Sequence, residues 1–159
     1  MDNALMNQLI DRYKEAMFTV ERRLNVLLRE EMPEELTLDQ YCILQYAKSR
    51  GRCTSTELSE LLSVGKSSIT AMTGRLFDKR LISRIPDDKD RRVTYLELTP
   101  AGERLTAEAN DSIARVISGY LIHFDEAEAL QFIRTYEKLA KALSQPVQDE
   151  QESGGERER

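Results

Sequence analysis

Two short segments with helical apolar spacing, separated by Ser63-Val64-Gly65, limit the folds open to this chain more than any other part of it. Apolar residues recur at three- and four-residue intervals on both sides of that break. These residues are Leu58, Leu61, Leu62, Val64, Ile69, Met72, Leu76 and Phe77. Two amphipathic helices that share one small core across a tight turn form a helix-turn-helix, and the sequence predicts that unit here.

The second of these helices, predicted from Lys66 to Arg80, carries mostly small, hydroxylated or basic residues outside its apolar face. Small residues let a helix approach base edges in a major groove, while hydroxyl groups, Arg and Lys bind bases or phosphates. The candidate DNA-binding residues of this helix are Lys66, Ser67, Ser68, Thr70, Ala71, Thr73, Arg75 and Lys79. An ordinary solvated helix face explains the same composition when the helix is considered without its neighbours.

The two segments that follow, residues 81–86 and 93–99, have β-type residues in partial alternation. Every residue between them, from Asp87 to Arg92, is charged. The pattern predicts a strand hairpin with a polar tip, called the wing below. A charged tip alone is typical of a solvated loop, but its place directly after a basic helix-turn-helix favours contact with nucleic acid.

The wing sequence Asp87-Asp88-Lys89-Asp90-Arg91-Arg92, followed by Leu98-Thr99-Pro100-Ala101-Gly102, resembles the MarR family of transcriptional regulators. It is similar to the family's D-x-R-D-R-R wing and to the L-T-x-x-G that opens its next helix, and the resemblance extends from about residue 5 to residue 144. One departure is Lys89, where the family more often has Arg. Lys keeps the positive charge but lacks the planar fork that makes a bidentate contact.

The resemblance implies that Arg92 enters the DNA minor groove and that Asp90 holds the Arg92 side chain in place. A narrow minor groove has an enhanced negative potential that attracts an inserted Arg, which agrees with this role. The wing residues expected to serve DNA binding are Lys89, Asp90, Arg91 and Arg92.

The net charge of the 159-residue chain is -5, which would argue against a nucleic-acid partner if the charge were evenly spread. Residues 50–95, however, hold 10 basic and 6 acidic residues. The flanking segments are acidic, with 6 basic and 9 acidic residues in 1–49 and 7 basic and 13 acidic residues in 96–159. Clustered Lys and Arg displace counterions from DNA whatever the distant charges do. The central segment is therefore expected to bind double-stranded DNA.

Long apolar stripes occupy both ends of the chain. Residues 3–30 predict one amphipathic helix about 40 Å long, more than a small domain covers. A further helix begins at Thr99-Pro100, and Asp125 with Glu128 caps a last one. An intramolecular bundle would bury these stripes, but their length and the family resemblance favour a homodimer. A two-fold dimer presents its recognition helices to half-sites about one helical turn apart, so the expected operator is an inverted repeat.

The expected architecture is mainly α with a small β-hairpin wing, a winged helix-turn-helix with long terminal dimerisation helices. One domain covers residues 1–144, with dimerisation helices at 1–32 and 100–144 and a DNA-binding unit at 37–99. Residues 145–159 have little apolar content and are expected to be a disordered tail. The sequence shows no signal peptide and no long apolar run, so a cytoplasmic protein is expected.

Capping boxes start two helices of the DNA-binding unit: Thr37 with Gln40 starts a helix to about Ser49, and Thr54 with Glu57 starts the helix-turn-helix. Between these boxes lie the chain's two cysteines. Cys42 is expected in the core, whereas Cys53 directly precedes the helix-turn-helix, where partial exposure is one of the positions open to it. Their spacing fits neither a zinc site nor a disulfide framework, so no metal or cofactor is expected.

The expected function is a transcriptional regulator, specifically a repressor, that binds its operator as a homodimer. The resemblance implies that a small aromatic or phenolic ligand can bind between the DNA-binding unit and the dimer helices and release the DNA. Ordinary packing also explains the aromatic residues on those helices, which are Tyr13, Phe18, Tyr41, Tyr46 and Tyr120. A winged-helix module that binds proteins instead of DNA is the alternative. His123, the single histidine, has no matched nucleophile motif, so an enzyme is not expected.

Overall fold

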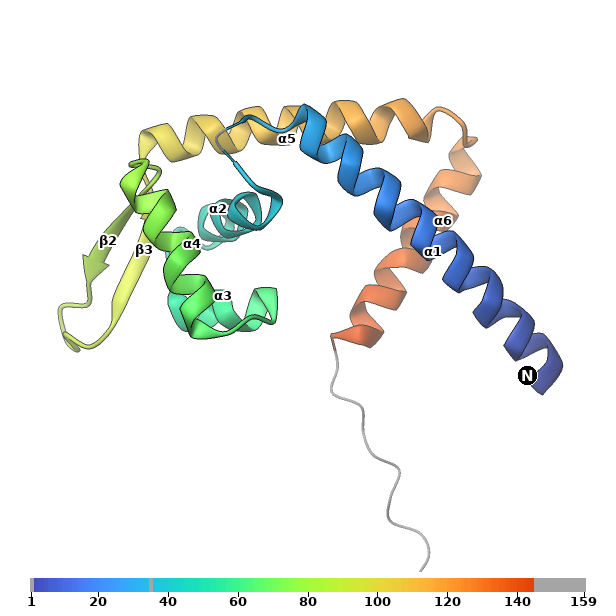
Figure 1. Ribbon diagram of the computed structural model, residues 1–159, viewed down its shortest axis with the longest axis horizontal. Coiled ribbons are helices and arrows are strands. Elements are labelled where there is room, and N and C mark those ends of the chain that lie inside the picture. The colour runs from blue at the N-terminus through green and yellow to red at the C-terminus, as the bar shows by residue number, and fades with distance from the viewer. Residues whose placement is uncertain (1, 35, 145–159) are drawn as a thin grey trace, which may run out of the picture. The chain divides into compact units, whose positions relative to one another are not determined.

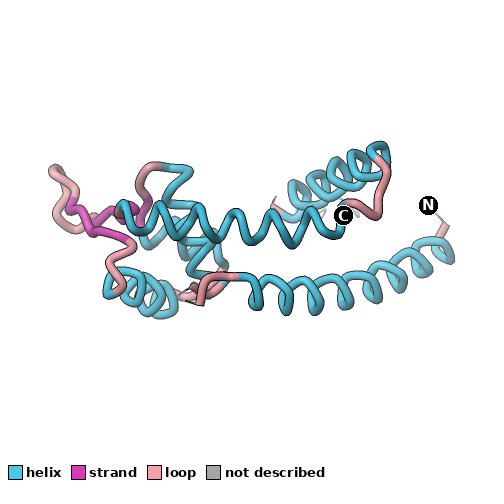
Figure 2. The backbone as a smooth tube through the Cα atoms, turned by 90° about the horizontal axis from the view of Figure 1, so that it is seen from above, coloured by secondary structure: helices cyan, strands magenta, loops and turns pink. Residues whose placement is uncertain are grey.

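The computed structural model describes residues 2–34 and 36–144, so the tail predicted at 145–159 lies outside the described residues. The chain divides into two compact units, Met1–Ser118 and Gly119–Arg159. The described part is mainly helical, and its strands gather in one place within the first unit (Figure 2). The expected fold class, helices with a small β wing, is confirmed.

The first two helices form where the sequence predicts them. Helix α1 spans Asn3–Glu31, and none of its residues is buried in the single chain. Helix α2, Leu38–Arg50, begins at the predicted capping box, in which the backbone N–H of Gln40 donates to Thr37 Oγ1 at 3.2 Å. It ends at Gly51, whose φ of 77° lies in the region that favours glycine. The buried side chains of α2 make it the central helix of the first unit.

The helix-turn-helix consists of α3, Ser55–Leu62, and α4, Lys66–Asp78. The second predicted capping box starts α3, because the Thr54 backbone N–H donates to Glu57 Oε2 at 2.6 Å and the Glu57 N–H donates back to Thr54 Oγ1 at 3.3 Å. These contacts with Thr54 lower the pKa of the Glu57 carboxyl. Leu58 and Ile69, one from each helix, are fully buried in the shared core.

The predicted wing is present and is one strand larger than expected. Strands β2, Ile82–Pro86, and β3, Thr94–Leu98, form an antiparallel hairpin that projects beside α4 (Figure 1). Strand β1, Cys53–Thr54, pairs with the other edge of β3, giving the order β1-β3-β2. Sequence periodicity missed β1 because two residues are too few to show alternation.

Two long helices complete the described chain. Helix α5, Pro100–Leu121, starts at the predicted Thr99-Pro100 boundary, and α6, Glu126–Leu143, starts at the predicted box of Asp125 and Glu128. Like α1, α6 has no buried residue in the single chain. No helix in the described part of the chain has both the length and the hydropathy to cross a membrane.

The structure corrects three details of the predicted helix-turn-helix. Leu61 and Phe77, expected in its core, are 46% and 43% exposed because their positions turn them to the outer face of the unit. Helix α4 ends at Asp78, whereas the sequence predicted its end at Arg80. Arg80 adopts a φ of 57°, which turns the chain from α4 into β2, and its carbonyl accepts a hydrogen bond from Thr99 Oγ1 at 2.6 Å.

The core position predicted for Cys42 is wrong, and the partial exposure considered for Cys53 is not found. Cys42, expected in the core, is exposed, whereas Cys53 is fully buried. The apolar residues of α2 are too numerous for one stripe, and Ile43, Leu44 and Ala47 take the inward positions. Cys53 is buried because β1 lays it against the core and pairs it with Leu96 of β3. Burial, aided by the charge of Glu57, raises the pKa of the Cys53 thiol to about 11.

We expect only Cys42 to react with Ellman's reagent at pH 8 in the native protein, because Cys42 is exposed whereas Cys53 is fully buried. Partial burial and the charge of Asp39 also raise the pKa of Cys42, so its reaction should be slower than that of a free thiol. Release of the coloured thiolate should report one equivalent before unfolding and a second one in urea. A Cys42→Ser variant should lose the native equivalent. Native Cys42→Ser that reacts as fast as the unfolded chain would contradict the burial of Cys53.

Candidate nucleic-acid interface

Helix α4 presents most of the predicted DNA-binding residues on its outer surface. The exposed residues of this group are Lys66, Ser67, Ser68, Thr70, Ala71 and Arg75 on α4, and Lys79, which directly follows the helix. The apolar residues Ile69 and Leu76 fix this orientation because they face the core with no exposed surface. The Thr70 hydroxyl donates to the Lys66 carbonyl at 2.8 Å, so it offers a ligand its acceptor lone pairs.

Thr73 is an incorrect site prediction. Its side chain is 3% exposed, and its hydroxyl donates to the carbonyl of Ile69 at 2.8 Å. A buried hydroxyl that already donates within its own helix cannot reach a base edge or a phosphate. Thr73 shares the inward face of α4 with Ile69 and Leu76. It can be a core residue because the helix backbone satisfies its hydroxyl group.

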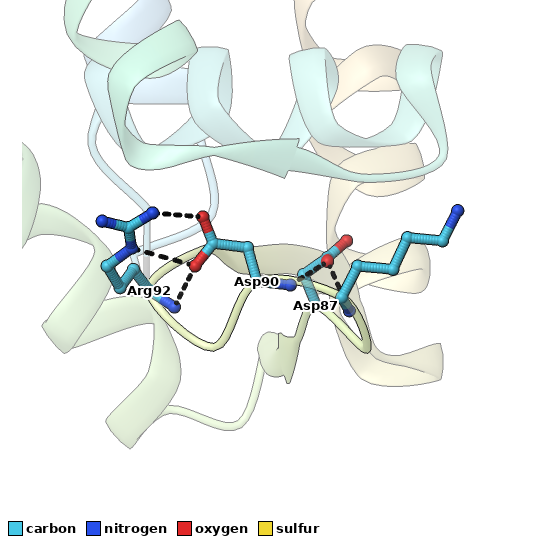
Figure 3. Close-up of polar contacts among 4 residues, drawn as sticks. Asp87, Asp90 and Arg92 are labelled. Atoms are coloured by element: carbon cyan, nitrogen blue, oxygen red, sulfur yellow. Dashed lines mark hydrogen bonds and ion pairs between the residues drawn. The ribbon is translucent and has the colours of Figure 1, made fainter.

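The wing tip is held by two carboxylates. Asp87 Oδ1 accepts the backbone N–H groups of Lys89 and Asp90, both at 2.8 Å, which closes the turn. The Asp90 carboxylate accepts three hydrogen bonds from Arg92, one from the backbone N–H at 3.0 Å and two from the guanidinium Nε and Nη2, both at 3.1 Å (Figure 3). The second carboxylate therefore holds the arginine by a two-point contact to the guanidinium and a third to its backbone.

These contacts fix the charge state of the wing as well as its shape. The Arg92 side chain lowers the pKa of the Asp90 carboxyl, and the backbone N–H groups of Asp90 and Lys89 lower that of Asp87. Arg92 itself is exposed, with 91% of its side-chain surface accessible. The predicted geometric relation between Asp90 and Arg92 is thus confirmed, and it presents an oriented cation to solvent.

Lys89 and Arg91, the other predicted wing residues, are exposed at the same tip. Only the backbone of Lys89 enters the turn, through its hydrogen bond to Asp87. The tip therefore combines two solvated cations with one arginine of fixed orientation.

Two further arginines in this region were not among the predicted site residues. The Arg84 guanidinium on β2 lies 4.7 Å from the centroid of the Phe77 ring, and that of Arg52 lies 4.1 Å from the centroid of the Tyr95 ring. Such contacts hold a cation in place by attraction to the ring face. Both arginines contribute to the excess of basic residues in segment 50–95, but only the tertiary structure shows which aromatic rings they contact.

Comparison with known proteins agrees with this geometry. The sequence profile of the MarR family matches residues 36–94. The transcriptional repressor MdtR of Bacillus subtilis is 32% identical over 134 residues, which cover 79% of this chain and 86% of MdtR. This chain belongs to the MarR family. The resemblance seen in the wing and in the start of α5 is therefore confirmed.

Solved structures of MarR-family proteins share the fold. A MepR-like protein complexed with pseudoligands is 32% identical, with a TM-score of 0.61 over 84% of this chain and 95% of that chain. A MarR mutant from E. coli complexed with operator DNA is 24% identical, with a TM-score of 0.69 over 89% of this chain and 99% of that chain. Members of the MarR family are DNA-binding transcriptional regulators, so this protein is a regulator and not an enzyme.

Proposed function

We propose that this protein is a repressor that binds an inverted-repeat operator as a homodimer. The observation that carries this proposal is that a basic winged helix-turn-helix occurs together with two long helices, α1 and α6, that contain no buried residue in the single chain. The α4 residues listed above and the wing residues Lys89, Arg91 and Arg92 would contact the DNA, with Asp90 orienting Arg92. MdtR, a relative of similar length, is named a transcriptional repressor, which supports repression rather than activation by this protein.

The support for a dimer comes from exposed apolar side chains on the terminal helices. On α1 the exposed large apolar residues are Leu5, Met6, Leu9, Ile10, Tyr13, Met17, Phe18, Val20 and Val26. In the second unit, α6 and the connection that precedes it carry a second group that includes Phe124, Phe132 and Tyr136, whose rings stack in sequence. Monomeric proteins rarely expose such contiguous apolar surface, so we assign residues 1–32 and 100–144 to dimerisation and 37–99 to DNA binding.

A small aromatic or phenolic ligand is proposed to release the operator. The MepR-like relative was solved with pseudoligands, which supports a ligand-responsive regulator of this kind. Among the aromatic residues considered, Tyr41 donates its hydroxyl to Asn110 Oδ1 at 2.6 Å and thereby links α2 to α5. A ligand that competes for this contact would change the packing of the DNA-binding unit against α5.

Selection of bound duplexes from a random DNA pool tests the function directly. We expect the enriched sequences to contain an inverted repeat with half-site centres about one helical turn apart, because a two-fold dimer presents two copies of α4. Sedimentation of the purified protein, alone and with the enriched duplex, should give a dimer in both cases. We expect hydroxybenzoates, added to the complex, to lower the bound fraction, and an unchanged bound fraction would contradict release by phenolic ligands of this kind.

Two results would contradict the proposal. A protein that remains monomeric at micromolar concentration while binding its selected duplex tightly would exclude the dimer. Selection that enriches no duplex at low ionic strength would exclude DNA recognition and favour a winged-helix module that binds proteins.

A further inference from the structure

Arg52 lies next to the wing, although in sequence it belongs to neither the helix-turn-helix nor the wing. It directly precedes β1, whose Thr54 pairs with Tyr95 of β3. This pairing carries the chain segment before α3 to the free edge of the hairpin. The exposed side chain of Arg52 then crosses to β3, where its guanidinium lies 4.1 Å from the centroid of the Tyr95 ring.

The guanidinium carbon of Arg52 lies over the face of the Tyr95 ring, and this contact does not use a hydrogen-bond acceptor. An Arg side chain carries five N–H donors in a planar fork. Within the described residues, the Arg52 side chain donates no hydrogen bond and forms no ion pair. A guanidinium that is oriented but has unused donors is suited to bidentate contact with a phosphate.

The electrostatic surroundings place this cation at the base of the wing. The positive charge of Arg52 is one of the influences that lower the pKa of Asp87, after the hydrogen bonds from the Asp90 and Lys89 backbone. Asp87 is the residue that closes the wing turn, and Asp90 in that turn holds Arg92. The Tyr95 ring under Arg52 belongs to the residue next to Thr94, which pairs with Pro86 at the end of the hairpin, so Arg52 lies close to the loop that presents Arg92.

We propose that Arg52 binds a phosphate of the DNA backbone beside the wing, with Tyr95 as the positioning residue that orients its guanidinium. This inference rests on the proposed function, since it extends the same DNA interface to β1. Because Tyr95 already holds the Arg52 side chain, Arg52 loses less conformational entropy on binding. A freely moving Lys or Arg side chain would lose more. A phosphate contact carries no sequence information, so Arg52 would strengthen binding to every duplex and would set the position of the wing on the backbone.

The test measures fluorescence anisotropy of two labelled duplexes, the selected inverted repeat and an unrelated sequence of equal length, over a series of salt concentrations. Arg52→Ala should weaken binding to both by about 3- to 10-fold near physiological salt and flatten the slope of log K against log salt by about one unit. Arg52→Lys should keep the slope, because it keeps the charge, but should lose part of the affinity. Tyr95→Leu should weaken binding less than Arg52→Ala and leave the slope near that of the wild type.

Arg104→Ala is the matched control, because Arg104 is an exposed cation on α5 outside the winged unit. It removes the same long-range charge and should leave the slope unchanged. A slope equally flattened in both variants, or unchanged in Arg52→Ala, overturns the phosphate contact. Weaker binding to the inverted repeat alone, with an unchanged slope, also overturns it and assigns Arg52 to the wing conformation. Wild-type protein that binds neither duplex removes the proposed function together with this inference.

Discussion

An Arg92→Ala variant is expected to bind the selected operator about 5- to 150-fold more weakly than the wild type. The reason is geometric as well as electrostatic. Asp90 holds the guanidinium at two points, so in the proposed complex Arg92 would reach the DNA already oriented, and a narrow minor groove attracts such a cation. Titration of the labelled inverted repeat by anisotropy measures the loss. Binding to an unrelated duplex should fall less, because the groove shape that favours Arg92 is a property of the operator.

The role of Asp90 can be separated from that of its charge. Asp90→Asn removes a negative charge near the DNA, and that change alone would strengthen binding to phosphates. Loss of the ion pair frees the Arg92 side chain and should weaken binding instead. A weaker Asp90→Asn complex therefore demonstrates positioning. For the Arg92→Ala experiment, Arg104→Ala is again the control for the loss of one distant cation. Unchanged operator affinity in Arg92→Ala would exclude the wing contact.

A Gly102→Ala variant is expected to lose about 2 to 4 kcal/mol of folding free energy. A Cβ added at Gly102 would lie 2.0 Å from the carbonyl oxygen of Leu81. That oxygen cannot move aside cheaply, because it accepts the backbone N–H of Thr99 at 3.0 Å at the junction of the wing and α5. The variant must therefore separate α5 from the start of β2. Urea unfolding at a fixed protein concentration measures the change.

Gly74→Ala provides the matched control for this substitution. Gly74 lies within α4, and an added Cβ there would meet no atom within 4 Å other than those of its chain neighbours and of its own helix backbone. Replacing a helical glycine by alanine at such a site should stabilise the protein by about 0.5 to 1 kcal/mol, because alanine loses less conformational entropy on folding. If Gly102→Ala were as stable as Gly74→Ala, the close approach to Leu81 would be contradicted.

The close contact of Gly102 also gives a physical reason for a motif that the sequence identified only by resemblance. Leu98-Thr99-Pro100-Ala101-Gly102 matches the family's L-T-x-x-G. The Thr99 hydroxyl accepts the Gly102 N–H at 3.1 Å and donates to the Arg80 carbonyl at 2.6 Å. Thr99 thus caps α5 while tying it to the end of α4, and the glycine allows the helix to approach Leu81. The motif fixes the wing relative to the recognition helix.

Local interactions explain which features the sequence determined by itself. A capping box needs only two residues three apart, so the starts of α2, α3 and α6 followed directly from Thr37, Thr54 and Asp125. Apolar periodicity gave the extents of α1 and α4 to within two residues. The hold of Asp90 on Arg92 spans two positions of one loop, and the family resemblance was sufficient to predict it.

Only the tertiary structure decided the features that depend on contacts between distant segments. The burial of Cys53 and the stacking of Arg52 both require β1 to pair with β3, which lies some forty positions further along the chain. The inward orientation of Thr73 depends on how α4 rotates against its neighbours, because its hydroxyl can be satisfied by its own helix wherever it points. Periodicity reports which residues share a face, but packing against other elements determines which face is inside.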